Sequence, residues 1–392
     1  MDTKVSLTMQ PVSQNERIQI LDILRGFAIF GILVVNILGF ASPRWLPGYP
    51  VSEGQPWYDT LASYLVIFLA EGKFYSTFSF LFGLGFSVQL ARAEARGTDI
   101  RSFYPRRLWV LFGIGILHAL LFWTGDILRV YALLGFALLA FRTRANRTLL
   151  VWTGAFFTVS LLILTLMGGP GASSEAIPGI DLLAIARETY TRSSILSVLI
   201  FQAIELPFSF LLILLGQGPS VMALFLLGLL AGRQRLFNDI EKNHRAFKRL
   251  LWVGLLLGVA GHSLFLLTEN GFLLSLGFTV GAPALAAFYV SGLSLLSQPD
   301  WGRRLLAPLA NVGRMALSNY VLQSIVCSLI FNGYGLGLYE KVGDAGLLGI
   351  AITIYLVQIP LSAWWLQRFY FGPLEWLWRS LTYGKRQPFR RD

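Results

Sequence analysis

Apolar runs long enough to cross a lipid bilayer recur from the start of the chain to its end, and short polar stretches separate them. A helix needs about 20 apolar residues to cross the hydrocarbon core, where it satisfies its own backbone hydrogen bonds. We therefore predict an all-α fold, a polytopic transmembrane helical bundle of about ten spans. The predicted spans are residues 20–40, 74–91, 108–123, 126–141, 149–167, 195–231, 250–267, 272–296, 312–331 and 347–366.

Two segments depart from this pattern. Residues 57–70 are apolar and aromatic but too short to cross, which predicts an interfacial helix. The stretch 195–231 contains two apolar runs split by the Gly- and Pro-rich residues 216–219. Because the loop that follows is strongly basic, we predict a kinked or broken helix that crosses the membrane once.

The basic residues are concentrated in short loops and in the C-terminal tail. In a ten-span arrangement these arginine-rich stretches all lie on one side, which the positive-inside rule assigns to the cytoplasm. Both termini are then cytoplasmic, and residues 1–392 form a single integral membrane domain with cytoplasmic tails at 1–19 and 368–392. The formal net charge of +11 reflects this topology, and no nucleic-acid partner is expected.

Composition supports this interpretation. Hydrophobic residues make up 55% of the 392 residues and charged residues only 14%, which is too little charge for a soluble protein of this size. The single cysteine, Cys327, lies in an apolar run, so disulfides and thiolate metal sites are excluded. The sequence contains no convincing metal-ligand cluster or nucleotide-binding glycine motif, so neither a metal nor a prosthetic group is expected.

Polar residues inside the predicted spans are the first candidates for function, because charge within an apolar helix is costly. Asp22 and Arg25 lie on one face near the start of the first span. Either Arg25 extends toward lipid headgroups while Asp22 stabilises the helix N-terminus, or Arg25 binds an anionic ligand that arrives from the cytoplasm. Asn36 follows roughly 21 Å beyond Asp22, and a lone asparagine there is more often a contact between helices than a catalyst.

The hairpin at residues 117–136 has the densest set of polar groups. A tight reversal brings the ends of its two helices together, so His118 can approach Asp126. A carboxylate beside an imidazole orients the ring and stabilises its protonated form, as a general base requires. In the alternative, which spacing alone favours, Asp126 caps the second helix and pairs with Arg129, and His118 makes a packing hydrogen bond. His262 is a second catalytic candidate, but nothing near it in sequence supports that role.

A further polar face begins at Arg314 and continues along the predicted span 312–331. Arg314, Ser318, Asn319, Gln323 and Ser324 concentrate polarity in an otherwise apolar helix. Such a face suits a path for a polar ligand that enters from the cytoplasm. Hydrogen bonding between helices is the alternative explanation.

Several stretches of the chain resemble the YeiB-type bacterial membrane proteins, a family described as DUF418. They are LDILRGFAIFGILVVN near the start, EGKFYSTFSFLFGLGF at 71–86, the hairpin at 118–136 with GDILRVYALLG, GRMALSNYVLQS at 313–324 and FGPLEWLWRSLTYG at 371–384. They occur in order over nearly the whole chain. The resemblance implies a multi-pass protein of the bacterial cytoplasmic (inner) membrane and leaves its activity undefined.

The first span also resembles, more distantly, the opening helix of the acyltransferase-3 and heparan-glucosaminide acetyltransferase groups. That resemblance implies transfer of an acyl group from cytoplasmic acyl-CoA to a sugar or lipid acceptor on the other side. The acyltransferase-3 pattern is Asp, then Arg three residues on, then His fourteen after the Asp; Asp22 and Arg25 match, but Asn36 replaces the histidine. A neutral amide cannot act as a base, so we assign that role to His118, oriented by Asp126. Asn36 would instead hydrogen-bond the developing oxyanion.

The leading hypothesis is therefore a transmembrane acyltransferase. Arg25 and Arg314 would neutralise the phosphates of acyl-CoA, and Asn319 and Gln323 would contribute to the donor site. The expected partners are membrane lipids, acyl-CoA and a sugar or lipid acceptor, and a homodimer is compatible with the sequence. A transporter or lipid flippase with the same polar residues along its pathway, and a membrane scaffold or sensor without substrate, are the alternatives.

Overall fold

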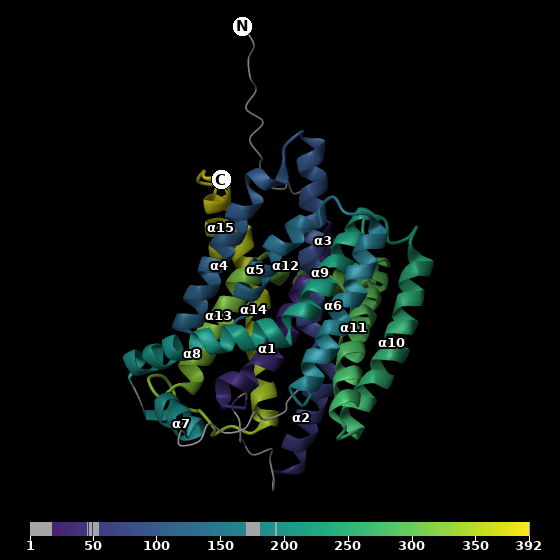
Figure 1. The fold of residues 1–392 in the computed structure, drawn as a ribbon. Helices are drawn as coiled ribbons and strands as arrows, with labels where there is room; N and C mark the ends of the chain where they lie inside the picture. Colours follow the sequence, from purple (N-terminus) through teal and green to yellow (C-terminus); the bar gives the residue numbers. More distant parts are fainter. Residues whose placement is uncertain are drawn as a thin grey trace.

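The computed structural model describes residues 18–44, 46, 49, 55–169, 181–192 and 194–391, and most of the predicted cytoplasmic tail 1–19 lies outside them. These described residues form a bundle of helices without a β-strand (Figure 1), which confirms the predicted all-α class. The long helices are α1 (Gln19–Ala41), α3 (Lys73–Ala95), α4 (Tyr104–Leu121), α6 (Asn146–Leu166), α8 (Ile195–Gly216), α10 (His244–Leu267), α11 (Gly271–Leu296) and α14 (Asp344–Arg368). The shorter ones are α2 (Trp57–Leu69), α5 (Leu128–Ala140), α7 (Leu182–Arg192), α9 (Gly218–Arg233), α12 (Asp300–Arg314), α13 (Ala316–Phe331) and α15 (Pro373–Tyr383).

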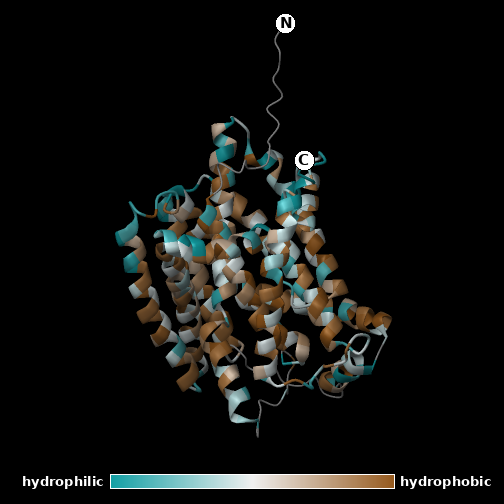
Figure 2. Cartoon of the chain, turned by 180° about the vertical axis from the view of Figure 1, so that it is seen from behind, coloured by the Kyte–Doolittle hydropathy of each residue, from teal (hydrophilic) through white to brown (hydrophobic). Residues whose placement is uncertain are grey.

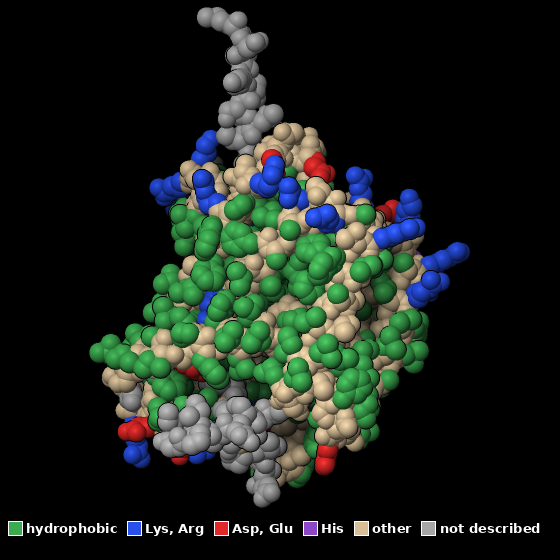
Figure 3. All heavy atoms as spheres, in the orientation of Figure 1, with side chains coloured by type: hydrophobic (Ala, Val, Ile, Leu, Met, Phe, Trp, Pro, Cys, Tyr) green, Lys and Arg blue, Asp and Glu red, His purple; other side chains and the backbone are tan. Residues whose placement is uncertain are grey.

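The described residues have the helices of a multi-pass membrane protein. Seven of its helical segments are long and apolar enough to cross a bilayer, and there are eight if the bent pair α12 and α13 is counted as one span. The apolar helices α5 and α9 are too short to meet the same criterion alone. Hydrophobic residues dominate the middle of the bundle, and hydrophilic ones gather toward the end where the C-terminus is marked (Figure 2). Lys and Arg side chains gather around that same end (Figure 3).

The predicted continuous span 312–331 is wrong. The chain breaks at Met315, and α12 and α13 meet at an angle of 77°. The start of α13 is capped from outside, because the Glu375 carboxylate accepts hydrogen bonds from the backbone N–H groups of Leu317 (2.7 Å) and Ser318 (3.1 Å). This cap satisfies amide groups that a continuous helix would have bonded internally.

The predicted interfacial helix 57–70 is also different in the structure. Helices α2 and α3 form one apolar segment of 39 residues, interrupted only by a short turn. Gly72 lies in this turn with φ of 84°, a conformation that glycine adopts without steric cost. The predicted break in 195–231 is confirmed, since α8 ends at Gly216 and α9 starts at Gly218.

Helix α1 lies in the middle of the bundle and packs against α3, α12, α13 and α14. It crosses α12 with the two backbones in contact, at Gly26 of α1 and Gly313 of α12. A Cβ atom on Gly313 would overlap the backbone carbonyl of Asp22, and one on Gly26 would overlap that of Leu309. Close crossing of the two helices therefore depends on these glycines, as is common between transmembrane helices.

We expect Gly313→Ala to destabilise the protein by about 1–3 kcal/mol, because the added methyl group forces α1 and α12 apart. Gly154→Ala in α6 is the matched control, since its Cβ would meet open space. That change is expected to be neutral or to stabilise by up to about 1 kcal/mol through helix propensity. Thermal unfolding in detergent measures both, and equal behaviour of the two variants would contradict the close crossing.

Candidate functional site

A cavity of about 310 Å³ lies among α1, α3, α4, α13 and α15. Charged residues of its wall come from α1, α3, α4, α12 and α15 at the basic end of the molecule. They are Asp22, Arg25, Arg92, Arg107, Arg314, Glu375 and Arg379. Five arginines against two carboxylates give this part of the wall a formal charge of +3. The cavity is therefore suited to an anionic ligand.

Two of the arginines are held by aromatic or acidic neighbours from the same wall. Arg25 Nη1 lies 3.1 Å from Asp22 Oδ1, one helical turn away. The Arg107 guanidinium lies 3.6 Å from the centre of the Trp378 ring, whose Nε1 donates a hydrogen bond to the Arg107 carbonyl at 2.8 Å. A stacked guanidinium keeps its N–H donors directed outward from the edge of its plane, where a phosphate can accept them.

The deeper wall of the cavity is apolar. Its residues include Ile29 and Ile32 of α1, Phe78 and Phe82 of α3, and Leu128 of α5. Ten residues of helix separate Asp22 from Ile32, which corresponds to a depth of about 15 Å. The cavity thus combines a cationic part with an apolar interior, the arrangement that an anionic group attached to a hydrocarbon chain requires.

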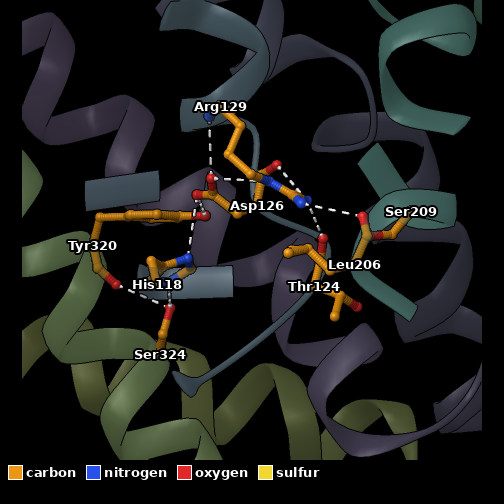
Figure 4. A network of polar contacts seen from close by, with 8 residues as sticks. All are labelled: His118, Thr124, Asp126, Arg129, Leu206, Ser209, Tyr320 and Ser324. Carbon is orange, nitrogen blue, oxygen red and sulfur yellow. Dashed lines mark hydrogen bonds and ion pairs between the residues drawn. The ribbon is translucent and has the colours of Figure 1, made fainter. Parts of the chain in front are cut away.

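Tyr320 of α13 lies in the cavity wall and also belongs to a buried polar network (Figure 4). Its hydroxyl donates to Asp126 Oδ1 at 3.2 Å, and its ring packs on the His118 ring with centroids 4.8 Å apart. His118 Nδ1 lies 3.2 Å from Asp126 Oδ1, within ion-pair distance although not aligned as a hydrogen bond. On its other side, His118 Nε2 lies 2.8 Å from Ser324 Oγ. The tyrosine ring therefore separates the cavity from an Asp–His–Ser series.

Arg129 completes the surroundings of the Asp126 carboxylate, and both side chains are 0% exposed. The Arg129 backbone N–H donates to Asp126 Oδ2 at 3.2 Å, and its Nε lies 3.8 Å from the same oxygen. Its Nη2 donates to the carbonyl of Thr124 at 2.6 Å. Asp126 thus contacts His118, Arg129 and Tyr320 together, so the contacts that the two alternatives predict for the hairpin are all present.

Only some of the remaining predicted site residues lie in the cavity wall. Arg25 and Arg314 both lie in the cavity wall, as the donor hypothesis requires. Asn319 and Gln323 are outside that wall and bond to α14 instead, with Asn319 Nδ2 donating to Ser362 (3.0 Å) and Gln323 Nε2 to Gln358 (2.8 Å). These two amides therefore connect α13 to α14.

Asn36 and His262 are also absent from the cavity wall. Among the residues that the structure describes, the Asn36 side chain, which is partly buried, makes no hydrogen bond. His262 of α10 contacts Lys73 of α3, whose Nζ also donates to the carbonyl of Ile67 at 2.7 Å. His262 thus belongs to a separate buried pair.

Sequence reasoning missed four residues of the cavity wall, Arg92, Arg107, Tyr320 and Arg379, and it identified Ser324 only as part of a polar face. The arginines were assigned to cytoplasmic loops and a tail, because nothing local distinguishes a topology arginine from one that faces a cavity. No local feature of the sequence singles out Tyr320. Ser324 is 206 residues from His118 in sequence, so only the fold brings the two together.

The half-buried Glu375 that caps α13 has a pKa above its ordinary value of 4.5, because burial disfavours its charged form. At pH values between the pKa of Glu375 in the unfolded chain and its higher pKa in the folded protein, the folded protein holds a proton that the unfolded chain has released. Stability from this group is therefore present below pH 4.5 and is lost as the pH rises through the folded pKa.

We expect Glu375→Gln to remove this part of the pH dependence, because the amide stays neutral at every pH whereas the carboxyl group of Glu375 titrates. Unfolding midpoints in detergent, measured from pH 4.5 upward, should decline less steeply than for the unsubstituted protein. The control Glu269→Gln, at an exposed position before α11, should retain the full slope. Equal slopes for both variants would contradict the assignment.

Comparison with known proteins gives consistent matches along the chain. Residues 231–385 match the family described as "Protein of unknown function (DUF418)", a region that includes α12 to α15. Over 98% of both chains, the sequence is 37% identical to the uncharacterized protein YxaH of Bacillus subtilis (strain 168). It is 32% identical to an uncharacterized 39.9 kDa protein from the amylase 3' region of Bacillus acidopullulyticus, over 97% of this chain and 98% of that protein. It is 31% identical to the uncharacterized protein YeiB of Escherichia coli (strain K12), over 94% and 96%.

Proposed function

The chain belongs to the DUF418 family, and we propose that this member transfers an acyl group from cytoplasmic acyl-CoA to an extracytoplasmic or lipid-linked acceptor. One observation carries the proposal. A cavity with five arginines in its wall and an apolar interior reaches Tyr320, which also contacts His118 and Asp126. Binding of a phosphorylated thioester in this cavity would place its acyl end near the one buried imidazole–carboxylate pair found among the described residues.

The proposed topology has ten crossings of the inner membrane and two cytoplasmic termini. The arginine-rich stretches between α3 and α4, between α5 and α6, and after α9 support it, because they lie at one end of the bundle (Figures 1 and 3). In this topology α8 and α9 together make one crossing, and α13 makes another. The cationic part of the cavity then faces the cytoplasm, where acyl-CoA is found.

Donor binding would use both parts of the cavity. Arg25 and Arg314 would contact phosphates, as the sequence predicts, together with Arg92, Arg107 and Arg379. Charge-assisted hydrogen bonds from guanidinium groups to phosphate oxygens are among the stronger polar contacts. The acyl chain would lie against the apolar side chains of α1 and α3, and membrane lipid would surround the bundle.

The proposed chemistry depends on His118. Its Nε2 is the atom that would accept the proton, and Asp126 Oδ1 lies 3.2 Å from Nδ1 on the other side of the ring. Tyr320 must move aside for a thioester to reach the ring, because it now covers His118 on the cavity side. Asn36, Asn319 and Gln323 have no role in this proposal, since all three lie outside the cavity wall.

We expect His118→Ala to lower acyl transfer about 100-fold or more, which is the usual effect of losing a general base. The assay is incubation of the protein in sealed vesicles with labelled acetyl-CoA and cell-envelope extract. His244→Ala is the matched control, because His244 is exposed at the start of α10 and outside the cavity. Ligand that crosses the vesicle membrane without covalent change would favour a transporter instead.

Donor affinity gives a second test. We expect Arg107→Gln to weaken binding of coenzyme A about tenfold or more, because a charged hydrogen-bond donor is lost. Arg304→Gln changes the charge equally on the exposed face of α12 and should leave the affinity unchanged. Titration calorimetry in detergent would measure both. Equal affinities for the two variants would exclude the cavity as the donor site.

A further inference from the structure

Ser324 occupies a position in the buried network that packing alone does not explain. It lies in the middle of α13, while His118 comes from the last turn of α4 and Asp126 from the turn before α5. Oxygen, imidazole and carboxylate follow one another at 2.8 and 3.2 Å. Hydroxyl, imidazole and carboxylate in this order form the arrangement that activates a serine as a nucleophile.

We propose that Ser324 carries the acyl group as an ester between donor and acceptor. This inference rests on the proposed acyl transfer and specifies its route. The serine hydroxyl has two acceptors within reach, the Tyr320 carbonyl at 3.2 Å and His118 Nε2 at 2.8 Å. Rotation about the Cβ–Oγ bond directs its proton to either one, so the hydroxyl is set to transfer that proton to the imidazole.

Ser328 provides an internal comparison. It lies one helical turn beyond Ser324 on α13 and is equally buried, at 2% exposure for each. Its hydroxyl donates to the carbonyl of Phe122 at 3.3 Å, which is an ordinary contact between helices. Ser324 differs in that its Oγ contacts an imidazole that is itself beside a carboxylate. Substituting each serine in turn therefore distinguishes a role in helix packing from a role in the reaction.

The path from the cavity to Ser324 passes Tyr320. This residue precedes Ser324 by one turn on the same face of α13, and its ring packs on His118. When the Tyr320 side chain rotates away, its hydrogen bond to Asp126 breaks and the His118 ring is exposed to the cavity. The apolar cavity wall then leads the acyl chain toward the serine.

The first step forms an ester and releases the thiol. Ser324 Oγ attacks the thioester carbonyl carbon, and its proton passes to His118 Nε2. The C–S bond breaks, and the departing sulfur takes the proton from the imidazolium, which leaves acyl-serine and free coenzyme A. In the second step an acceptor hydroxyl or amine gives its proton to His118 and attacks the ester carbonyl, and Ser324 Oγ leaves with that proton.

An acyl-serine intermediate explains how one site can serve substrates from two sides of a membrane. Donor and acceptor need not be bound at the same time, because the protein holds the acyl group after coenzyme A has left. Ser324 is eight residues from the start of α13, about 12 Å along the helix. It therefore lies well inside the bundle.

The test is covalent labelling without acceptor. The purified protein is incubated with labelled acetyl-CoA alone, and the labelled peptide is identified by mass spectrometry. We expect up to one acetyl group per protein on Ser324, with release of coenzyme A. Ser324→Ala and His118→Ala should not be labelled, whereas Ser328→Ala should be labelled as the unsubstituted protein is. Ser324→Cys should be labelled as a thioester, which neutral hydroxylamine cleaves. Labelling of this variant would show that the site still folds when the serine hydroxyl is replaced.

Transfer to acceptor should fall about 1,000-fold or more in Ser324→Ala, because loss of a nucleophile is among the largest effects of a single substitution. Transfer at an undiminished rate in Ser324→Ala, or label on a residue other than Ser324, would overturn this inference and leave the proposed function intact. Neither label nor transfer in the unsubstituted protein would instead overturn the proposed function itself.

Discussion

The Asp126 carboxylate, fully buried inside an apolar bundle, is the constraint on which the arrangement of the site depends. An uncompensated charge in such surroundings costs several kcal/mol, so its neighbours must be polar and correctly placed. The Arg129 backbone N–H donates a hydrogen bond to Oδ2 and the Tyr320 hydroxyl donates one to Oδ1, while His118 Nδ1 lies within ion-pair distance of Oδ1. These contacts connect the hairpin of α4 and α5 to α13, which lies about 200 residues later in the sequence. Compensating one buried charge thus fixes the position of the imidazole and of the tyrosine that covers it.

The cavity follows from a second set of constraints at the basic end of the bundle. Close crossing of α1 and α12 at Gly26 and Gly313 brings Arg25 and Arg314 to one wall. Helix α15 packs beside α4 and adds Trp378, which stacks on Arg107. Arginines near the cytoplasmic ends of transmembrane helices are common, since they set topology. In this protein some of the arginines at the basic end of the bundle line a cavity whose deeper wall is apolar.

Much of the framework could be predicted from sequence, because apolar periodicity and basic loops are local signals. The approach of His118 to Asp126 was also predictable, since a short reversal forces the two helix ends together. The contacts between residues far apart in the sequence could not be predicted in this way. Asn319 and Gln323 shared a predicted polar face with Arg314, yet the break at Met315 and the partners on α14 separate them from the cavity. Nothing local could show that Ser324 meets an imidazole 206 residues away.

The central claim is that the cavity brings an acyl thioester to His118. A cryo-electron microscopy structure with a non-hydrolysable thioether analogue of acetyl-CoA tests it most directly. The account predicts phosphates within hydrogen-bonding distance of Arg25 and Arg107, a Tyr320 ring rotated away from His118, and the acyl carbon beside Ser324 Oγ. An analogue bound outside the cavity, or bound within it while Tyr320 still covers His118, would contradict the account.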